Sequence, residues 1–245
     1  MTTNETVSHY ESLLAPIYTW MLGDLDVALA RSRAELEFLG IGRASPGARA
    51  LDLGAGTGLQ SIPLHDLGYA VTAVDLSREL LSELSASRPA IRTVVEDITS
   101  EGAFGDGDWS VLVCMGDTLT HLPTFDAVDR AISLSVRALA AGGQAIFGFR
   151  DYTAAPPSSE QFIFVRGDDR RILTCRLRHE TEAQVRVTDV VHERTDGTWS
   201  LRTSSYGKLR LSRGWVSESL RFHGARVTRA TTESGRVVLL ATKDR

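Results

Sequence analysis

The chain has 245 residues, a net charge of −4 and an apolar fraction of 42%, which is the composition of an ordinary globular protein with a full hydrophobic core. No apolar run reaches the roughly 18 residues that span a bilayer, and the polar, acidic N-terminus differs from a signal peptide. The two cysteines lie far apart and have no metal-ligand spacing with the six histidines. We therefore expect a cytoplasmic protein with no membrane partner, disulfide framework or bound metal.

The basic residues concentrate in the second part of the chain. Residues 1–150 hold 10 Lys and Arg against 19 Asp and Glu, whereas residues 151–245 hold 17 against 12. These basic residues alternate with apolar ones along strand-like segments. The pattern favours solvated strand faces over a nucleic-acid groove, and we expect no nucleic-acid partner.

We expect short helices and then one longer amphipathic helix before the first strand. Residues 7–22 fit one or two short helices interrupted near Pro16, and residues 26–39 fit an amphipathic helix that ends at Gly40. The first of these segments is rich in aromatic residues, among them Tyr10, Tyr18 and Trp20. It either forms a lid over a bound ligand or packs on the edge of a sheet, and the sequence leaves both interpretations open.

Residues 51–58, Leu-Asp-Leu-Gly-Ala-Gly-Thr-Gly, form the most informative segment of the chain. They fit a buried strand over 49–53, a glycine turn, and a helix over 58–67. Glycines lack a Cβ, so the backbone can approach a ligand and point its N–H groups at it. This is the nucleotide-binding corner of doubly wound sheets. A dinucleotide fingerprint starting at Gly54 would need glycine at position 59, where Leu59 stands, and this disfavours a nicotinamide-dependent dehydrogenase.

Strands and helices continue to alternate after this turn, which predicts a doubly wound, mostly parallel sheet. The strands cover 70–74, 91–95, 111–115 and 144–149, the helices 77–86 and 126–141, and a surface loop 102–108. Asp75 ends the second strand, where a carboxylate can accept the ribose hydroxyls of a nucleoside. The alternative is that Asp75 caps the next helix. Asp117 and His121 follow the fourth strand at the same edge, where such sheets carry out chemistry.

From residue 161 the period changes to two, which indicates antiparallel strands. They cover 161–165, 171–178, 184–192 and 199–206, with hairpin turns at 167–169 and 195–197. A helix capped by Ser212 and running to about His223 follows. A hairpin over 225–231 and 236–242 ends the chain.

Three stretches, 51–58, 113–123 and 149–152, together resemble the glycine N-methyltransferase branch of the class I S-adenosylmethionine-dependent methyltransferases. The resemblance implies a seven-stranded Rossmann-like sheet with an antiparallel insertion after its fifth strand. It also implies S-adenosyl-L-methionine as cofactor and a small-molecule substrate. The parts expected on this basis are an N-terminal helical lid (1–40), a cofactor-binding core (41–150), a β insertion covering the substrate site (151–211), and the last helix with the closing hairpin (212–245).

We expect a set of cofactor contacts, part of which is carried over from the resemblance position by position. They are Tyr18, Met21, Arg33, Asp52, Gly54, Ala55, Gly56, Gly58, Asp75, Leu76, Asp97, Ile98 and Met115. The glycines would face the methionine part and Asp75 the ribose. Asp97 and Ile98 would meet the adenine, and Met115 would flank the sulfonium. Arg33, or else Arg31, would meet the cofactor carboxylate.

We expect four catalytic or substrate-binding residues: Asp117, His121, Arg150 and Tyr206. Arg150 matches the arginine that grips the carboxylate of glycine, for which a guanidinium fork is suited; the alternative is a surface contact. Asp117 departs from the asparagine of the family, which suits a cationic amine and puts glycine itself in doubt. Asp117, His121 or Tyr206 can take or relay the amine proton, and solvent is the alternative.

The sequence therefore predicts methyl transfer to a small amine or amino-acid-like acceptor. O-methylation of a small carboxylate or natural product stays open, as does a non-catalytic adenosyl-ligand-binding protein. A nucleic-acid methyltransferase is disfavoured because no Asn-Pro-Pro-aromatic motif follows the fourth strand. Whether the protein forms a homo-oligomer is left open.

Overall fold

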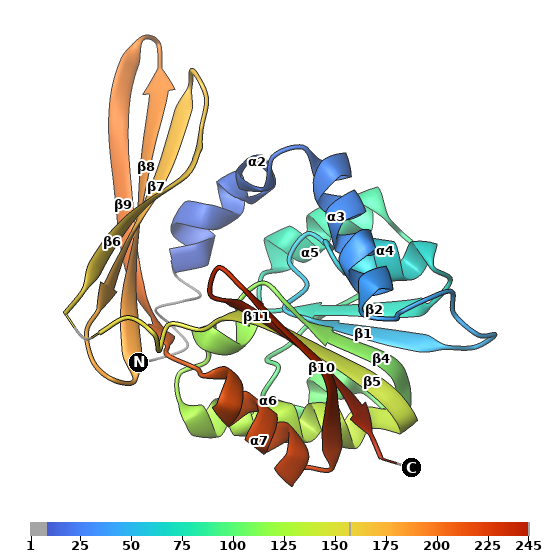
Figure 1. The fold of residues 1–245 in the computed structure, drawn as a ribbon. Helices are drawn as coiled ribbons and strands as arrows, with labels where there is room; N and C mark the ends of the chain where they lie inside the picture. The colour runs from blue at the N-terminus through green and yellow to red at the C-terminus, as the bar shows by residue number, and fades with distance from the viewer. Residues whose placement is uncertain (1–8, 157, 245) are drawn as a thin grey trace.

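The structure, a computed structural model, describes residues 9–156 and 158–244 (Figure 1). Its centre is a seven-stranded sheet with the strand order β10-β11-β5-β4-β1-β2-β3. The strands are β1 (Arg49–Leu53), β2 (Ala70–Asp75), β3 (Arg92–Val95), β4 (Trp109–Cys114), β5 (Leu139–Arg150), β10 (Ala225–Glu233) and β11 (Arg236–Lys243). The first five run parallel, and β11 is antiparallel to both of its neighbours. The predicted mostly parallel, Rossmann-like sheet is confirmed.

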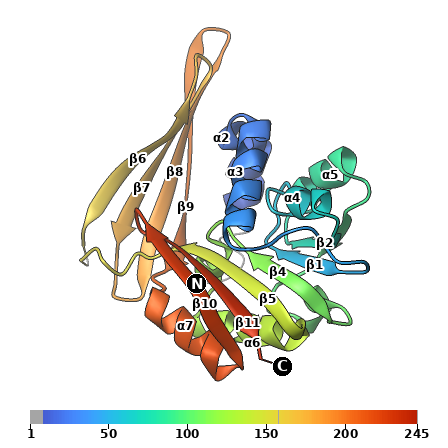
Figure 2. The same cartoon turned by 45° about the vertical axis from the view of Figure 1, so that its right-hand side comes forward.

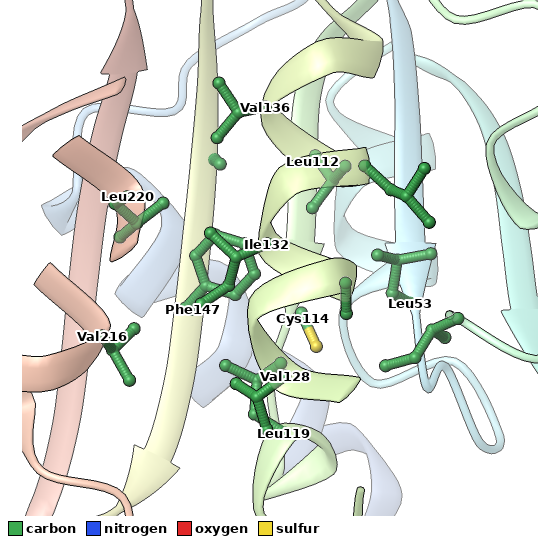
Figure 3. Close-up of a cluster of buried hydrophobic side chains, with 14 of the residues drawn as sticks. Leu53, Leu112, Cys114, Leu119, Val128, Ile132, Val136, Phe147, Val216 and Leu220 are labelled. Carbon is green, nitrogen blue, oxygen red and sulfur yellow. The ribbon is translucent and has the colours of Figure 1, made fainter. Parts of the chain in front are cut away.

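Helices cover both faces of this sheet because alternate strand residues point to opposite sides. One face packs against α3 (Leu25–Phe38), α4 (Ser61–Asp66) and α5 (Arg78–Ser87). The other packs against α6 (Phe125–Ala138) and α7 (Arg213–Phe222). Figure 3 shows this second core, where Phe147 of β5 lies among Ile132 of α6 and Leu220 of α7. Two separate apolar cores thus fix the sheet from both sides.

The helix starts follow local sequence signals. Ser77 accepts a hydrogen bond from the Leu80 N–H at 3.3 Å, and Ser212 accepts one from the Trp215 N–H at 3.1 Å. Both serines therefore cap the helices that were predicted to begin after them.

Three predicted boundaries are wrong, each for a local reason. The helix after the glycine turn begins at Ser61, not Gly58, because Gly58 has φ +94°. The next long helix ends at Ala138 rather than residue 141, and β5 begins at once, with an irregular stretch between Leu139 and Gln144 in its pairing with β4.

The third boundary concerns the predicted surface loop 102–108. It begins inside a 3₁₀ turn, η3 (Glu101–Phe104), whose Ala103 and Phe104 are buried. Trp109 Nε1 donates a hydrogen bond of 2.9 Å to the Phe104 carbonyl. This contact draws the turn into the core.

The predicted antiparallel insertion is confirmed as a second sheet of four strands. They are β6 (Glu160–Gly167), β7 (Arg171–His179), β8 (Gln184–Thr195) and β9 (Thr198–Leu209), paired in that order. Asp196 and Gly197, at φ +50° and +79°, make the predicted tight turn between β8 and β9. Figure 2 shows this sheet standing beside the central sheet, with α2 and α3 on its inner side.

The N-terminal segment consists of η1 (Tyr10–Leu14), η2 (Ala15–Ile17) and α2 (Tyr18–Leu22). Leu13, Leu14 and Ile17 pack against Leu173 and Val191 on the inner face of the second sheet. No single helix in the described ranges is long and apolar enough to cross a membrane, although Ser12–Leu22 and Leu25–Phe38 pass that test together as a bent pair.

Candidate active site

A cavity opens where β1, β2, β3 and β4 end, at the edge where doubly wound sheets bind ligands. Its walls come from the glycine turn, the three loops beside it, and the N-terminal segment. Ten of the predicted residues line it: Tyr18, Gly54, Ala55, Gly56, Asp75, Leu76, Asp97, Ile98, Met115 and His121. Eight others were not predicted: Thr57, Leu59, Gln60, Ser77, Leu80, Gly116, Thr118 and Leu122. Most of these are sequence neighbours of predicted residues, and that adjacency was the available signal.

The three glycines of the turn have different surroundings. All have positive φ, a region that strains other residues. A Cβ at Gly54 would overlap the Thr118 side chain, and one at Gly58 would lie 2.5 Å from Leu84 Cδ1. A Cβ at Gly56 would meet only the Tyr18 ring, at an ordinary 3.5 Å. Gly54 and Gly58 are thus required by the packing of the chain itself, and the predicted contact residue Gly58 lies outside the cavity.

Asp75 joins the turn to the next helix. Its Oδ2 accepts the Gly56 N–H and its Oδ1 accepts the Ser77 N–H, both at 2.8 Å. Burial raises the pKa of Asp75, and these hydrogen bonds oppose the rise. The cap of α5 is Ser77, so the helix-capping role considered for Asp75 belongs to its neighbour.

Asp52 lies beneath the turn and not in the cavity, contrary to its assignment as a cofactor contact. Its side chain is buried, and Ser61 Oγ donates a hydrogen bond of 2.6 Å to Oδ2. Its Oδ1 is buried and has no hydrogen-bond partner among the described residues. Burial, with a smaller contribution from the nearby Asp75, raises the pKa of Asp52 to about 7.

Two further predicted cofactor contacts lie away from the cavity. Arg33 is on the outer side of α3 and pairs with Glu37 one turn later, at 3.0 Å. Met21 packs beside Leu173 and Val191 of the second sheet. Arg31, the alternative to Arg33, is exposed on the same helix and does not line the cavity either. The Arg33 side chain is 43% exposed and bound to Glu37 on its own helix, and neither arginine lines the cavity.

The aromatic N-terminal segment contacts both the cavity and the second sheet. The Tyr18 ring lies over Gly56, and burial raises the pKa of Tyr18 to about 12. Trp20 Nε1 instead donates to Asp168 Oδ2 at 2.6 Å, and its ring lies under the guanidinium of Arg171. The side chain of Tyr10 lies outside the described part of the chain. In this segment Tyr18 thus contacts the cavity, as expected for a lid, whereas Trp20 packs on the second sheet.

Asp117 accepts three hydrogen bonds from its own protein. It adopts a left-handed conformation, φ +71°, at the start of η4 (Thr118–His121). Its Oδ1 accepts the backbone N–H of Arg150 at 2.5 Å, and its Oδ2 accepts Lys208 Nζ at 2.9 Å and the Tyr152 hydroxyl at 3.3 Å. Burial would raise the pKa of Asp117, but the charge of Lys208 and its hydrogen bond hold that pKa below the usual value.

Lys208 was missed because nothing in the sequence connects it to Asp117, 91 positions earlier. It belongs to β9, which lies against η4. The pairing of β8 with β9 and the packing of the second sheet create this contact, and neither can be read from a local motif.

The Arg150 side chain does not reach the cavity, contrary to the predicted carboxylate grip. It is exposed, and its Nη1 donates a hydrogen bond of 3.0 Å to the carbonyl of Ser234, in the turn between β10 and β11. Arg150 pairs with Arg236 across β5 and β11, which brings that turn beside it. Only its backbone N–H meets Asp117.

His121 lines the cavity, and Tyr206 lies behind it. The centres of the His121 and Tyr206 rings lie 5.4 Å apart, with 13° between the ring planes, so the rings stack. The centre of the His9 ring lies 4.2 Å from that of Tyr206. Burial and the positive charge of Lys208 lower the pKa of His121 well below its usual value, so the imidazole is neutral near pH 7. Burial raises the pKa of Tyr206 above its usual value. Tyr206, like Asp117, is not part of the cavity wall.

Comparison with known proteins places this site in context. Residues 50–143 match the family model for a methyltransferase domain. The chain is 28% identical to glycine N-methyltransferase of Rattus norvegicus over 182 residues, which are 65% of this chain and 60% of that protein. The chain therefore matches about three fifths of the length of that relative.

Two solved structures have the same fold. The CcbJ methyltransferase from Streptomyces caelestis has a TM-score of 0.75 at 18% identity, covering 87% of this chain and 90% of that one. CalS10 from Micromonospora echinaspora, an amino pentose methyltransferase with bound S-adenosylmethionine, has a TM-score of 0.69 at 16% identity, covering 99% and 97%.

Proposed function

Because the chain belongs to the class I S-adenosylmethionine-dependent methyltransferases, we propose that it transfers a methyl group from S-adenosylmethionine to the nitrogen of a small amine. One observation supports an acceptor that carries an N–H or O–H hydrogen, and the name of the rat relative, glycine N-methyltransferase, favours nitrogen. A neutral imidazole, His121, lines the same cavity as the glycine turn and Met115. Such a group accepts a hydrogen bond from an N–H and leaves the nitrogen lone pair unprotonated.

The residues of the cavity fit the cofactor. The Thr57 Oγ1 is buried on the cavity wall without a hydrogen-bond partner among the described residues, so a polar ligand atom can satisfy it. The oxygens of Asp75 each accept one backbone N–H and keep lone pairs for ribose hydroxyls. In this proposal Asp97 and Ile98 hold the adenine, and Gly56 leaves room for the backbone of the turn to contact the ligand.

When bound, S-adenosylmethionine supplies a methyl group on a positively charged sulfur, which is open to in-line attack by a lone pair. The protein then mainly orients the acceptor. His121 would accept a hydrogen bond from the amine N–H and so direct the lone pair, while Met115 and Tyr18 exclude water around it. Alignment of this kind can contribute roughly 7–11 kcal/mol to lowering a barrier. The proton released from the methylated nitrogen passes to solvent.

The charge of the cavity wall supports an amine without a neighbouring carboxylate. None of the described residues that line the cavity is a lysine or an arginine. The Arg150 guanidinium, which would be the clamp for an amino acid, lies on the Ser234 carbonyl instead. The rat relative is named for glycine, whereas the structural neighbour CalS10 is named for an amino pentose. We therefore favour an amino sugar, which has an amine and no carboxylate, as the acceptor.

The test uses methyl-labelled S-adenosylmethionine and matched acceptors. Calorimetry first measures cofactor binding. A panel of amino sugars, their hydroxyl analogues and glycine is then incubated with the enzyme, and mass spectrometry locates the label. We expect label on the nitrogen of a carboxylate-free amine. Label on oxygen would refute N-methylation, label on glycine alone would refute the carboxylate-free acceptor, and absence of cofactor binding would refute the whole proposal.

A further inference from the structure

The ammonium group of Lys208 occupies the centre of the polar cluster behind the cavity. The residue is 8% exposed, and its Nζ lies 2.9 Å from Asp117 Oδ2. The same Nζ lies 6.0 Å from the ring centre of Tyr152 and 5.9 Å from that of Tyr206. Lys208 does not line the cavity. Any effect on the reaction must therefore pass through its neighbours.

We propose that Lys208 is a positioning residue of the acceptor site, which offsets the charge of Asp117 and so keeps His121 an uncharged hydrogen-bond acceptor, so that the site admits an amine in its neutral form. This inference rests on the proposed function. It assigns to the second sheet, through β9, a part in selecting the protonation state of the substrate.

The contacts link Lys208 to His121 by two routes. Asp117, which binds Lys208, begins the short turn η4 that ends at His121. Tyr206, two residues before Lys208 on β9, stacks on the His121 ring. The backbone of η4 and the ring stack thus hold the imidazole near a fixed charge pair.

The charged and titratable groups around His121 come from three elements. Lys208 of β9 and His9 of the N-terminal segment lower the pKa of His121, and Asp117 of η4 raises it, while burial lowers it most. Tyr206, whose pKa is raised, faces the ring as a neutral phenol. The signs for single substitutions follow. Removing Lys208 deletes a positive charge and leaves Asp117 uncompensated, so the pKa of His121 rises. Removing the charge of Asp117 has the opposite effect.

The pKa of His121 sets the lowest pH at which the site can bind the amine. A protonated His121 donates hydrogen bonds and repels a cation, so it cannot accept an N–H from the amine. Because Lys208 lowers the pKa of His121, the imidazole becomes protonated only at lower pH. The site can therefore bind the amine over a wider pH range.

The experiment compares Lys208→Met, Asp117→Asn and the double variant, which preserve side-chain size. The titration of the His121 imidazole is followed by NMR and assigned with His121→Gln; this readout needs no turnover. The control is Lys243→Met, which replaces the only other lysine, whose Nζ binds the carbonyls of Arg137 and Leu139 far from the cavity.

We expect Lys208→Met to move the His121 titration upward by about one pH unit or more, and Asp117→Asn to move it downward. The double variant should lie between them, and Lys243→Met should match the natural protein. For the amine that the labelling test identifies, the acid limb of the pH profile of kcat/KM should move upward in Lys208→Met by the same amount as the His121 titration. The affinity for the cofactor should not change.

Two results would overturn the proposal. One is a shift in the same direction for Lys208→Met and Asp117→Asn, or none in either, which would indicate a merely structural pair. The other is a shifted His121 titration with an unmoved acid limb. Failure of the proposed function is a separate observation, since it shows as no methylated amine from the natural protein.

Discussion

Replacing Asp52 with asparagine should remove a loss of stability that the natural protein suffers as the pH rises. Asp52 is buried beneath the glycine turn, its Oδ1 has no hydrogen-bond partner among the described residues, and its pKa is raised from 3.8 to about 7. The folded state therefore holds a proton that the unfolded chain releases at lower pH. Stability is highest below the unfolded pKa and falls as the pH rises towards the folded one.

The size of the effect follows from the two pKa values. Each pH unit between 3.8 and about 7 costs about 1.4 kcal/mol, and the total is about 4 kcal/mol. Between about pH 5 and about pH 8, where denaturation is easily measured, the difference amounts to about 2–3 kcal/mol. Asparagine keeps an oxygen for the Ser61 hydroxyl but cannot ionise, so its own contribution should not change with pH.

The assay is urea denaturation at about pH 5 and about pH 8 without cofactor, followed by the fluorescence of the four tryptophans. The free energy of unfolding of Asp52→Asn, relative to the natural protein, should increase by about 2–3 kcal/mol from the lower to the higher pH. The comparison cancels other titrating groups that both proteins share. If the two proteins show parallel pH dependences, Asp52 is ionised in the folded state and the argument fails.

Three other substitutions test the turn and its surroundings. Asp75→Ala should weaken cofactor binding by about 1.5–3 kcal/mol, the range for hydrogen bonds to a charged group, and an unchanged dissociation constant in calorimetry would remove it from the ribose role. Gly54→Ala should destabilise the fold by about 1–3 kcal/mol through overlap with Thr118; thermal unfolding should show partial recovery on adding Thr118→Ala, and no recovery would exclude that overlap as the cause. Ser77→Ala should cost about 1 kcal/mol of stability by loss of the α5 cap, and urea denaturation midpoints unchanged from the natural protein would contradict it.

The parts predicted well from the sequence are those with local causes. The bounds of β1 and the capping serines depend on residues within a few positions of each other, and the glycine spacing carries its own geometry. The seven-stranded, mostly parallel sheet follows from the resemblance and from the alternation of strands and helices. The ten predicted residues that line the cavity all lie in the N-terminal segment or at the ends of β1 to β4.

The parts that failed depend on contacts between distant segments. Arg150 was placed correctly at the end of β5, but its side-chain direction is set by the β10–β11 turn, whose Ser234 accepts its hydrogen bond. Asp117 is predicted to meet substrate, whereas in the structure it binds Lys208 of β9 and does not line the cavity. Arg33 was carried over by resemblance, yet its position on α3 gives it Glu37 as a partner. Side-chain orientation of this kind needs tertiary structure.

The surroundings of the three turn glycines have a consequence for how the sequence can change over time. Because Thr118 and Leu84 of the protein itself occupy the space beside Gly54 and Gly58, these glycines are needed for folding even without a ligand. Gly56 has no such constraint from packing. A descendant that lost catalysis but kept its fold would retain the outer two glycines, whereas position 56 could accept a residue that tolerates its left-handed backbone, φ +53°, such as asparagine or aspartate. The residue at that position is therefore the one to inspect when active and inactive members of a lineage are told apart.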